Sequence, residues 1–407
     1  MPASSGAGGG GSSGKWLGLV GIGEDGVAGL GEAARGLVAG AEVVFGGRRH
    51  LALAAGLIRG EARAWPVPFD ASAVVGLRGR AVCVLASGDP FLHGVGAVLA
   101  REVGPEEMQV VPGASAFALA AARMGWALQD CETLALHGRP AALVRPLLQA
   151  GVRVLALTGD GEGPAAVARV LVEDGFGASR VTVLEALGGP GERVVSGRAE
   201  EVAGRSFAAL NLVAVEVAGG PGLPLGAGLP EAAFAHDGQI SKREVRAVTL
   251  AALAPRRGEL LWDVGAGSGA VGIEWMRLSP SLRAVAVEAR ADRAARVRAN
   301  AEALGVPGLG VVEGEAPGAL IGLPAPDAVF LGGGAAEAFE AAAAALRPGG
   351  RLVVNAVTLE TQALVTGWRG RLGGELVSLS VARAAPVGGM TGWRPAMPVV
   401  QWAWVKP

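Results

Sequence analysis

The chain has 407 residues, more than one ordinary hydrophobic core accommodates, so two domains are expected. Hydrophobic residues make up 51% of the sequence, and 36 basic residues balance 37 acidic ones to a net charge of -1. This composition excludes a polar disordered chain and gives no electrostatic basis for a nucleic-acid partner. The two cysteines and four histidines do not have the spacing of a zinc site or a disulfide framework, so no metal is expected.

The first 14 residues, MPASSGAGGGGSSG, are rich in glycine and serine and are expected to form a disordered tail. They lack the basic and apolar regions of a secretion signal. The sequence also has no apolar run long enough to span a bilayer. We therefore expect a cytoplasmic protein with no membrane partner.

Residues 15–218 form the first predicted domain. Short apolar runs alternate there with alanine-rich helical stretches, a pattern typical of an α/β fold with a mainly parallel sheet. Its expected strands cover residues 15–22, 81–86, 109–111, 152–158 and 211–217. A glycine- and proline-rich stretch follows, through which neither a helix nor a central strand can run, and we place the linker at residues 219–229.

Three turns in the first domain come directly after expected strands, at residues 20–26, 87–94 and 111–116. A strand followed by a glycine turn places backbone donors at the carboxyl edge of a sheet, where open α/β sheets bind ligands. As an ordered set, these turns resemble the tetrapyrrole methyltransferases of the cobalamin pathway. The resemblance implies a two-lobed α/β fold with the cofactor S-adenosylmethionine between the lobes, in a site lined by Ser87, Gly88, Asp89, Leu92, Ser115 and Ala116.

The second predicted domain covers residues 230–407. Seven expected strands alternate there with helical stretches, at residues 260–264, 284–288, 310–313, 328–331, 351–355, 376–381 and 399–405. The first strand is followed by a glycine turn, Gly265-Ala266-Gly267-Ser268-Gly269, and by an expected helix at residues 270–278. Glycines let the backbone approach a ligand closely, and a helix N-terminus favours an anionic group.

Glu288 ends the next expected strand, where a carboxylate can bind both hydroxyls of a ribose. NAD and S-adenosylmethionine both meet this pattern. Two features favour S-adenosylmethionine. Asp263, just before the glycine turn, can meet an ammonium group, and Glu315 and Ala316 follow the third strand, where methyltransferases hold adenine.

Together with residues 229–234, 237–246 and 351–360, these motifs resemble the decarboxylating precorrin methyltransferase domain of cobalamin biosynthesis. The resemblance implies a Rossmann-like, seven-stranded class I methyltransferase fold. It also implies that S-adenosylmethionine contacts Ser241, the turn from Gly265 to Gly269, Glu288 and Ala316.

Two domains of these types in this order resemble one family, the precorrin-6B C5,15-methyltransferases (decarboxylating). The resemblance implies methylation of a tetrapyrrole at C5 and C15 with decarboxylation of the C12 acetate, giving precorrin-8X, and two S-adenosylmethionine sites. A homo-oligomer is also expected. Two alternatives remain. An NAD-dependent oxidoreductase would use the same glycine turn and Glu288, and a non-catalytic precorrin carrier would bind the macrocycle without consuming cofactor.

The tetrapyrrole carries many acetate and propionate groups, for which arginine forks are apt receptors. The candidates are Arg139, Arg243, Arg246, Arg383 and Arg394, although each is also open to interpretation as an ordinary surface charge. His236 is a candidate proton donor in the decarboxylation, because its reference pKa lies near neutrality. The alternative is that it is a polar loop residue beside Asp237.

Overall fold

The computed structural model describes residues 14–407; the predicted tail therefore lies almost entirely outside the described residues. The chain divides into two compact units. Unit 1 runs to Arg139 and continues from Ala150 to Gly220, and unit 2 comprises Pro140–Gln149 and Pro221–Pro407. Among the described residues, no helix combines the length and the apolar character needed to cross a membrane.

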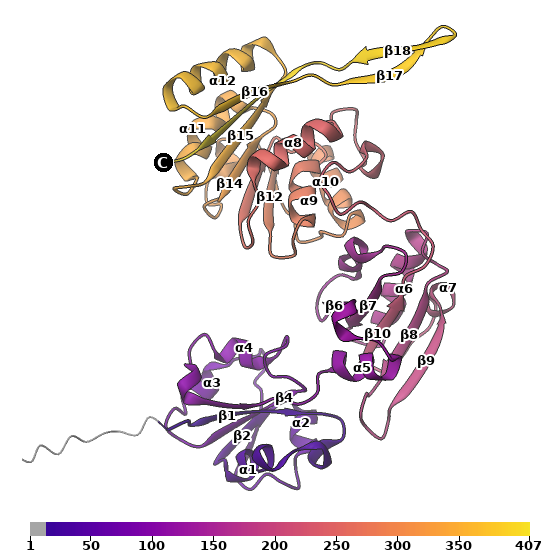
Figure 1. The fold of residues 1–407 in the computed structure, drawn as a ribbon. Coiled ribbons are helices and arrows are strands. Elements are labelled where there is room, and N and C mark those ends of the chain that lie inside the picture. Colours follow the sequence, from indigo (N-terminus) through magenta and orange to yellow (C-terminus); the bar gives the residue numbers. More distant parts are fainter. Residues whose placement is uncertain (1–13) are drawn as a thin grey trace, which may run out of the picture. The chain divides into compact units, whose positions relative to one another are not determined.

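Unit 1 contains two five-stranded sheets (Figure 1). All pairs in the first sheet are parallel. One of its interior strands, Leu17–Ile22, has six buried residues of six, as expected when helices cover both faces of a parallel sheet. The sheet has the order β3 (Glu61–Ala64), β2 (Val43–Gly46), β4 (Val82–Ser87), β1 (Leu17–Ile22), β5 (Met108–Val111), and its helices are α1 (Glu32–Gly40), α2 (Arg48–Leu53), α3 (Ser72–Val75) and α4 (Val95–Leu99).

The second sheet of unit 1 differs from the expected, mainly parallel arrangement. Only one of its pairs is parallel, and the other three are antiparallel. The edge strand β9 (Arg193–Arg198) was not predicted, because its exposed and polar residues give no apolar run. The order is β6 (Cys131–Ala135), β7 (Arg153–Leu157), β10 (Asn211–Glu216), β8 (Arg180–Glu185), β9, and the helices are α5 (Ala116–Met124), α6 (Gly163–Glu173) and α7 (Ala199–Val202).

Unit 2 is built on one seven-stranded sheet, which confirms the predicted strand count. Five neighbouring strands are parallel, and the last two run antiparallel to their neighbours. The order is β13 (Gly310–Glu313), β12 (Arg283–Glu288), β11 (Leu260–Val264), β14 (Ala328–Leu331), β15 (Arg351–Ala356), β19 (Val399–Val405), β16 (Glu375–Leu379).

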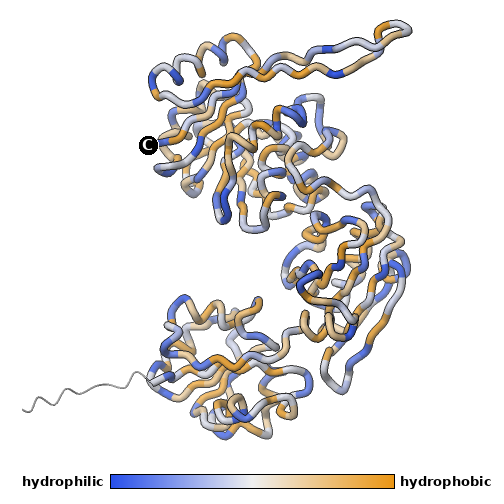
Figure 2. Tube along the Cα trace, viewed as in Figure 1, coloured by the Kyte–Doolittle hydropathy of each residue, from blue (hydrophilic) through white to orange (hydrophobic). Residues whose placement is uncertain are grey.

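Helices pack on both faces of this sheet, and the strands show as apolar segments between them (Figure 2). The side chains of β11 alternate between the two faces. Leu261 joins the core that includes α8 (Arg243–Leu253), α9 (Ala270–Arg277) and α10 (Ala291–Ala303), whereas Trp262 joins the core that includes α11 (Ala335–Ala345) and α12 (Leu359–Leu372). This period of two decides which strand residues face α8 and which face α11.

A two-stranded hairpin, β17 (Ala382–Val387) and β18 (Met390–Pro395), projects from the sheet of unit 2 (Figure 1). The sequence analysis did not predict it. Its strands are mostly exposed and contain prolines, so they lack the buried apolar pattern that marked the other strands.

The amino-terminal boundary of unit 2 yields a prediction. Leu229, placed in the linker by the sequence analysis, is buried in the core, and its N–H, with that of Gly228, donates to the carboxylate of Glu274. A fragment of residues 221–407 keeps these contacts and lacks only Pro140–Gln149 of unit 2, so it should unfold cooperatively by itself. A fragment of residues 230–407 lacks these contacts and should have a lower midpoint in urea, monitored by circular dichroism. Equal midpoints would contradict the role given to Gly228 and Leu229.

Candidate active site

A cavity of about 1380 Å³ opens in unit 2 where the parallel strands end. Three kinds of segment line it: turns after the parallel strands, the loop before α8, and the end of the sheet that carries the hairpin. Predicted cofactor residues among the lining are Ser241, Gly265, Ala266, Gly267, Ser268, Glu288, Glu315 and Ala316. Residues more than 150 positions apart in the sequence thus come together at one edge of the sheet.

The glycine turn takes a conformation that explains its composition. Gly265 and Gly267 have φ angles of +69° and +60°, in the region that side chains disfavour. At Gly265 a Cβ would also lie 2.6 Å from the backbone nitrogen of Gly333, whereas at Gly267 the nearest atom would be 3.6 Å away. Gly265 is therefore required by packing against the neighbouring turn, and Gly267 leaves open space on the cavity side.

Glu288 is anchored to the glycine turn. One carboxylate oxygen accepts a hydrogen bond from Gly267 N–H at 2.8 Å, and the other accepts one from Arg290 N–H at 3.1 Å. The residue is only 5% exposed. Because each carboxylate oxygen can accept more than one hydrogen bond, the anchored carboxylate keeps acceptor capacity toward the cavity.

Two buried polar atoms beside the turn have no hydrogen-bond partner within the described residues, Asp263 Oδ1 and Ser268 Oγ. Asp263 does not line the cavity; its Oδ2 accepts the N–H of Gly272 in α9 at 2.8 Å. Burial raises the pKa of Asp263 to about 7 against the lowering effect of that hydrogen bond, and Glu288 raises it further. Unpaired buried polar atoms are costly, so both atoms indicate a place for a ligand group or water.

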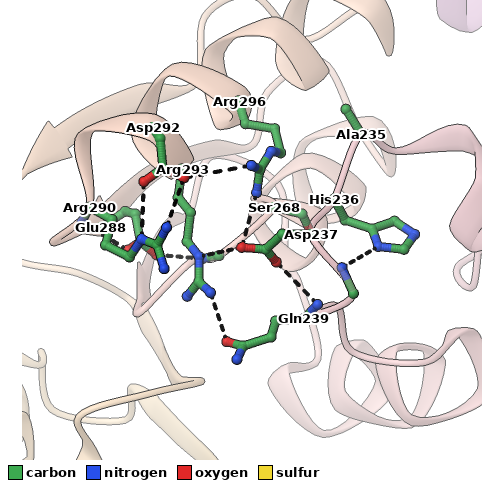
Figure 3. Close-up of polar contacts among 12 residues, drawn as sticks. Ala235, His236, Asp237, Gln239, Ser268, Glu288, Arg290, Asp292, Arg293 and Arg296 are labelled. Atoms are coloured by element: carbon green, nitrogen blue, oxygen red, sulfur yellow. Dashed lines mark hydrogen bonds and ion pairs between the residues drawn. The ribbon is translucent and has the colours of Figure 1, made fainter.

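The loop before α8 is fastened to α10 by charge (Figure 3). Arg293 donates to Asp237 Oδ2 at 2.9 Å and to Gln239 Oε1 at 3.0 Å, and Arg296 lies 3.4 Å from Asp237. Hydrogen bonds from Gln239 N–H and Arg293 lower the pKa of Asp237 to about 2. The aspartate therefore stays ionised at neutral pH, and the loop from Gly238 to Lys242 is held along the cavity wall.

His236 has a different position from the one predicted. Its side chain points away from the cluster of Asp237 and the arginines (Figure 3), it is exposed, and it is not among the residues lining the cavity. Its Nδ1 accepts the N–H of Gly238 at 3.0 Å, so the ring closes its own turn. This geometry does not support the prediction that His236 is a catalytic proton donor. His236 fits the alternative, a polar loop residue.

The prediction that Gly269 contacts the cofactor is not supported either. It is buried and does not line the cavity, and a Cβ there would lie 2.7 Å from a methyl group of Val297 in α10. This last glycine of the turn is required for packing between two helices instead of for contact with a cofactor.

Arg246 was predicted to bind substrate, and this prediction is wrong. Its side chain is fully buried and forms an ion pair with Glu274 at 2.5 Å, donates to the carbonyl oxygens of Ser241 and Leu229, and lies over the ring of Phe234. Each nitrogen of the guanidinium thus already has an acceptor. Arg246 fastens the loop before α8 to α9 and indirectly supports Ser241.

The other candidate arginines divide into two groups. Arg139 and Arg243 are exposed and do not line the cavity. Arg383 and Arg394 line it and face each other across the β17–β18 ladder. Arg383 is paired with Glu231 at 3.2 Å and Glu244 at 2.6 Å, whereas Arg394 has no hydrogen bond or ion pair with any described residue.

In unit 1, the three predicted turns meet at the carboxyl edge of the first sheet. Gly88 N–H donates to Ile22 at 3.3 Å, and Gly113 N–H donates to Gly88 at 2.9 Å. A Cβ at Gly21 would collide with the Gly88 carbonyl oxygen. The ends of β1, β4 and β5 therefore pack as one surface because the turns contain glycine.

The predicted cofactor residues of unit 1 lie on or beside this surface. Asp89 accepts the N–H of Phe91 at 2.8 Å, and Ser115 caps α5 by accepting the N–H of Ala118 at 3.1 Å, directly before Ala116. Gly88 is buried, and Leu92 is 41% exposed. The side chains of Asp89 and Ser115 thus already stabilise their own turns.

Ser87 contacts two residues that the sequence analysis missed, His50 and Arg49. Its hydroxyl lies 2.8 Å from His50 Nε2 and accepts from Arg49 at 3.0 Å, and Arg49 also pairs with Glu24. Burial, and then the charge of Arg49, lower the pKa of His50 to about 4, so the imidazole is neutral. These residues follow β2, whose four residues were too short a run to be recognised as a strand.

The cavity of unit 2 also contains polar residues that the sequence analysis did not single out: Lys242, Arg290, Arg293, Glu337 and Asn355. Asn355 ends a predicted parallel strand, so its position at the carboxyl edge could have been recognised. The arginines lie after the strand that ends in Glu288 and gave no comparable signal.

Comparison with known proteins divides the chain in the same order as the motifs. Residues 17–203 match the family model of tetrapyrrole (corrin/porphyrin) methylases, and residues 232–406 match that of the precorrin methyltransferase domain. The fold and these matches define an S-adenosylmethionine-dependent methyltransferase, which confirms the predicted enzyme class and fold class.

Relatives match over almost the whole chain. A Sinorhizobium sp protein named precorrin-6Y C(5,15)-methyltransferase [decarboxylating] is 57% identical over 96% of both chains. The protein of the same name from Mycobacterium tuberculosis H37Rv is 43% identical over 95% of this chain and 99% of its own. A solved C-terminal domain of precorrin-6Y C5,15-methyltransferase from Rhodobacter capsulatus is 47% identical, covering 45% of this chain and 100% of its own, with a TM-score of 0.43.

The chain belongs to the precorrin-6Y C5,15-methyltransferase (decarboxylating) family. The family resemblance predicted from the motifs is thereby confirmed. Membership in a family of enzymes leaves the NAD-dependent oxidoreductase and the non-catalytic carrier without support.

The buried ion pair of Arg246 and Glu274 yields a second prediction. Arg246→Met leaves the carboxylate of Glu274 buried without its counter-charge, and removal of one partner from such a pair costs about 3–5 kcal/mol. Urea unfolding should show this loss. Arg243→Met, which alters an exposed arginine on the same helix, should change the free energy of unfolding by less than about 0.5 kcal/mol. Equal stability of the two variants would contradict the assigned role of Arg246.

Proposed function

We propose that the chain methylates precorrin-6B, which its relatives' names give as precorrin-6Y, at C5 and C15 and removes CO2 from the C12 acetate, giving precorrin-8X. The observation that carries the proposal is the cavity of unit 2. It combines a glycine turn and an anchored glutamate at the sheet edge with a wall that carries Arg383 and Arg394. Its volume is large enough for a second, bulky molecule beside the cofactor. The assignment of C15 methylation and decarboxylation to unit 2, and of C5 methylation to unit 1, follows the resemblance of each half.

We propose two S-adenosylmethionine sites. In unit 2 the residues fit this cofactor. Gly267 leaves space beside the turn, Glu288 keeps acceptor capacity for ribose hydroxyls, and Asp263 Oδ1 and Ser268 Oγ lack partners within residues 14–407. Ser241, Glu315 and Ala316 complete the proposed contacts. When bound, the cofactor supplies the methyl group.

The proposed site of unit 1 is the surface formed by the ends of β1, β4 and β5, with Ser87, Gly88, Asp89, Leu92, Ser115 and Ala116. The support is the convergence of three glycine turns at one carboxyl edge, where backbone donors are available to a ligand. A homo-oligomer and a cytoplasmic location remain predictions from the sequence.

The wall of the unit 2 cavity formed by the hairpin suits the periphery of a tetrapyrrole. Arg383 and Arg394 are directly opposite each other, and like charges in a cross-strand pair repel. Arg383 is already neutralised by Glu231 and Glu244, so Arg394 is the better receptor of the two.

The chemistry places modest demands on the side chains. The meso carbons of the tetrapyrrole are enamine-like and conjugated to ring nitrogens, so they can attack an electrophilic methyl group without prior loss of a proton. The loss of CO2 leaves an electron pair that the conjugated macrocycle can accept. The residues of the cavity therefore hold the reactants in contact and exclude water, a contribution that can reach about 7–11 kcal/mol of the barrier.

The protonation of Asp263 yields a third prediction. A carboxylate that binds the cofactor's ammonium must be ionised, and its pKa of about 7 means that much of the protein carries it protonated below neutrality. Calorimetry on the fragment of residues 221–407 should show cofactor affinity falling about tenfold from pH 8 to pH 6. Asp263→Asn should bind weakly at both pH values. If cofactor affinity of Asp263→Asn still falls between pH 8 and pH 6, the pH dependence arises from another group and the prediction is wrong.

The division of the two reactions is tested by damaging each site separately. Leu92 is 41% exposed, and a Cβ at Gly267 would come no closer than 3.6 Å to another atom. Both Leu92→Arg and Gly267→Arg should therefore fold, the latter with some backbone strain from its φ of +60°, and circular dichroism checks this. With precorrin-6B and cofactor, mass spectrometry should show that the product of Leu92→Arg gains one methyl group and loses CO2. Gly267→Arg should abolish the decarboxylation and one methylation. Loss of decarboxylation in Leu92→Arg alone, with both variants folded, would overturn the assignment.

A further inference from the structure

Asn355 is a polar residue in an otherwise apolar part of the cavity wall. It lies one residue before the end of β15, lines the cavity, and is followed there by Val357. Val399, on the neighbouring strand β19, lines the same part of the cavity. The alternation of β15 places Leu352 and Val354 in the core next to α11 and α12, so Asn355 projects from the opposite face, toward α8.

A buried network of three side chains holds the Asn355 amide. Asn355 Nδ2 donates to the hydroxyl of Thr249 in α8 at 2.8 Å. Gln401, which is directly opposite Asn355 on β19, donates to the same hydroxyl at 3.1 Å and to Asn355 Oδ1 at 2.9 Å. Thr249 is completely buried and Gln401 is 3% exposed.

The protons of this network fix the orientation of the amide. The Thr249 hydroxyl donates its one proton to the carbonyl oxygen of Val245 at 2.8 Å. Its oxygen can therefore only accept from the two amides, which excludes the flipped orientation of Asn355. One N–H of Asn355 is used by Thr249, and within residues 14–407 no acceptor takes the other.

We propose that Asn355 donates this second N–H to the substrate carboxylate that leaves as CO2. The inference rests on the proposed function and assigns one residue of the cavity to the decarboxylation. The substrate carboxylates are then of two kinds. Those that the product retains suit Arg383 and Arg394, and the one that reacts suits a neutral donor.

The neutral donor has a chemical advantage at the reacting carboxylate. During decarboxylation the bond to CO2 breaks and its electron pair passes to the side-chain carbon and the conjugated macrocycle. CO2 departs, and the carbon then takes a proton from a water molecule. The negative charge therefore leaves the carboxylate oxygens. A guanidinium would stabilise the charged carboxylate more than the transition state and so raise the barrier. An amide can orient the carboxylate while stabilising its charge less than a guanidinium does.

The test compares three variants of the full-length protein with one control. Asn355→Leu removes the amide, and Asn355→Asp keeps its shape but replaces the N–H donor with an acceptor. Thr249→Val leaves Asn355 in place but removes the hydroxyl that orients it. Gln362→Leu changes an amide on α12 that does not line the cavity and serves as the control.

Release of CO2 from precorrin-6B, cofactor affinity and thermal unfolding are measured for each protein. Loss of the donor that orients the leaving carboxylate should lower kcat/KM for CO2 release about tenfold or more in Asn355→Leu and Asn355→Asp, because the carboxylate is then no longer held in the reactive geometry. Thr249→Val should show a smaller loss. Cofactor affinity should stay within about twofold of the wild type in all four variants, because Asn355 is not among the residues proposed to hold the cofactor.

Two results would overturn the inference. The first is CO2 release by Asn355→Leu within twofold of the control. The second is a loss of activity accompanied by equal losses of cofactor affinity and thermal stability, because the network would then have only a structural role. Failure of the wild type to release CO2 or transfer methyl groups would instead refute the proposed function.

Discussion

The direction of the strands is the constraint on which both candidate sites depend. Where a parallel strand ends, its last backbone groups have no further partners in the sheet, and the turn that follows presents them to one edge. In unit 1 this edge collects the turns after β1, β4 and β5, and in unit 2 it collects those after β11, β12, β13 and β14. The second, mixed sheet of unit 1 has three antiparallel pairs of four and so no such common edge, and none of the predicted cofactor residues lies on its strands.

The unit 2 site also depends on α8, which carries several of its buried polar groups. Arg246 ties the preceding loop to α9 through Glu274, and Thr249 orients the Asn355 amide. One turn of helix separates these two residues, so both lie on the same side of α8. Buried polar groups destabilise a fold unless they are hydrogen-bonded. Within both networks the polar groups are paired with one another, and the N–H of Asn355 that has no acceptor within residues 14–407 belongs to a residue that lines the cavity.

The sequence predicted the elements whose residues carry an unambiguous local signal. The seven strands of unit 2 were recognisable because most are continuous apolar runs, and the glycine turn because few other residues adopt φ near +60°. Strands β2, β3, β6 and β9 were missed since they are short or have polar, exposed residues. Strand β8, with five buried residues of six, was also missed, although its apolar residues could have been recognised. Their places in the sheets are set by pairing with distant strands, which no local pattern reveals.

Side-chain roles were harder to predict than backbone positions. A sequence shows that Arg246, Arg383 and His236 are available but not which of them a fold buries, pairs or turns toward solvent. The ion pair of Arg246 depends on Glu274, which lies 28 residues later in another helix. The residues at strand ends were predicted better, because the direction of the sheet alone places them.

The distribution of charge around the unit 2 cavity follows from the reactions proposed there. Carboxylates that persist through a reaction can be held by guanidinium groups, because the attraction is equal before and after the chemical step. A carboxylate that loses its charge in the transition state is better held by a neutral donor. An arginine pair on an exposed hairpin and an oriented amide on the sheet meet these two requirements separately, so binding strength and reactivity need not compete at one residue.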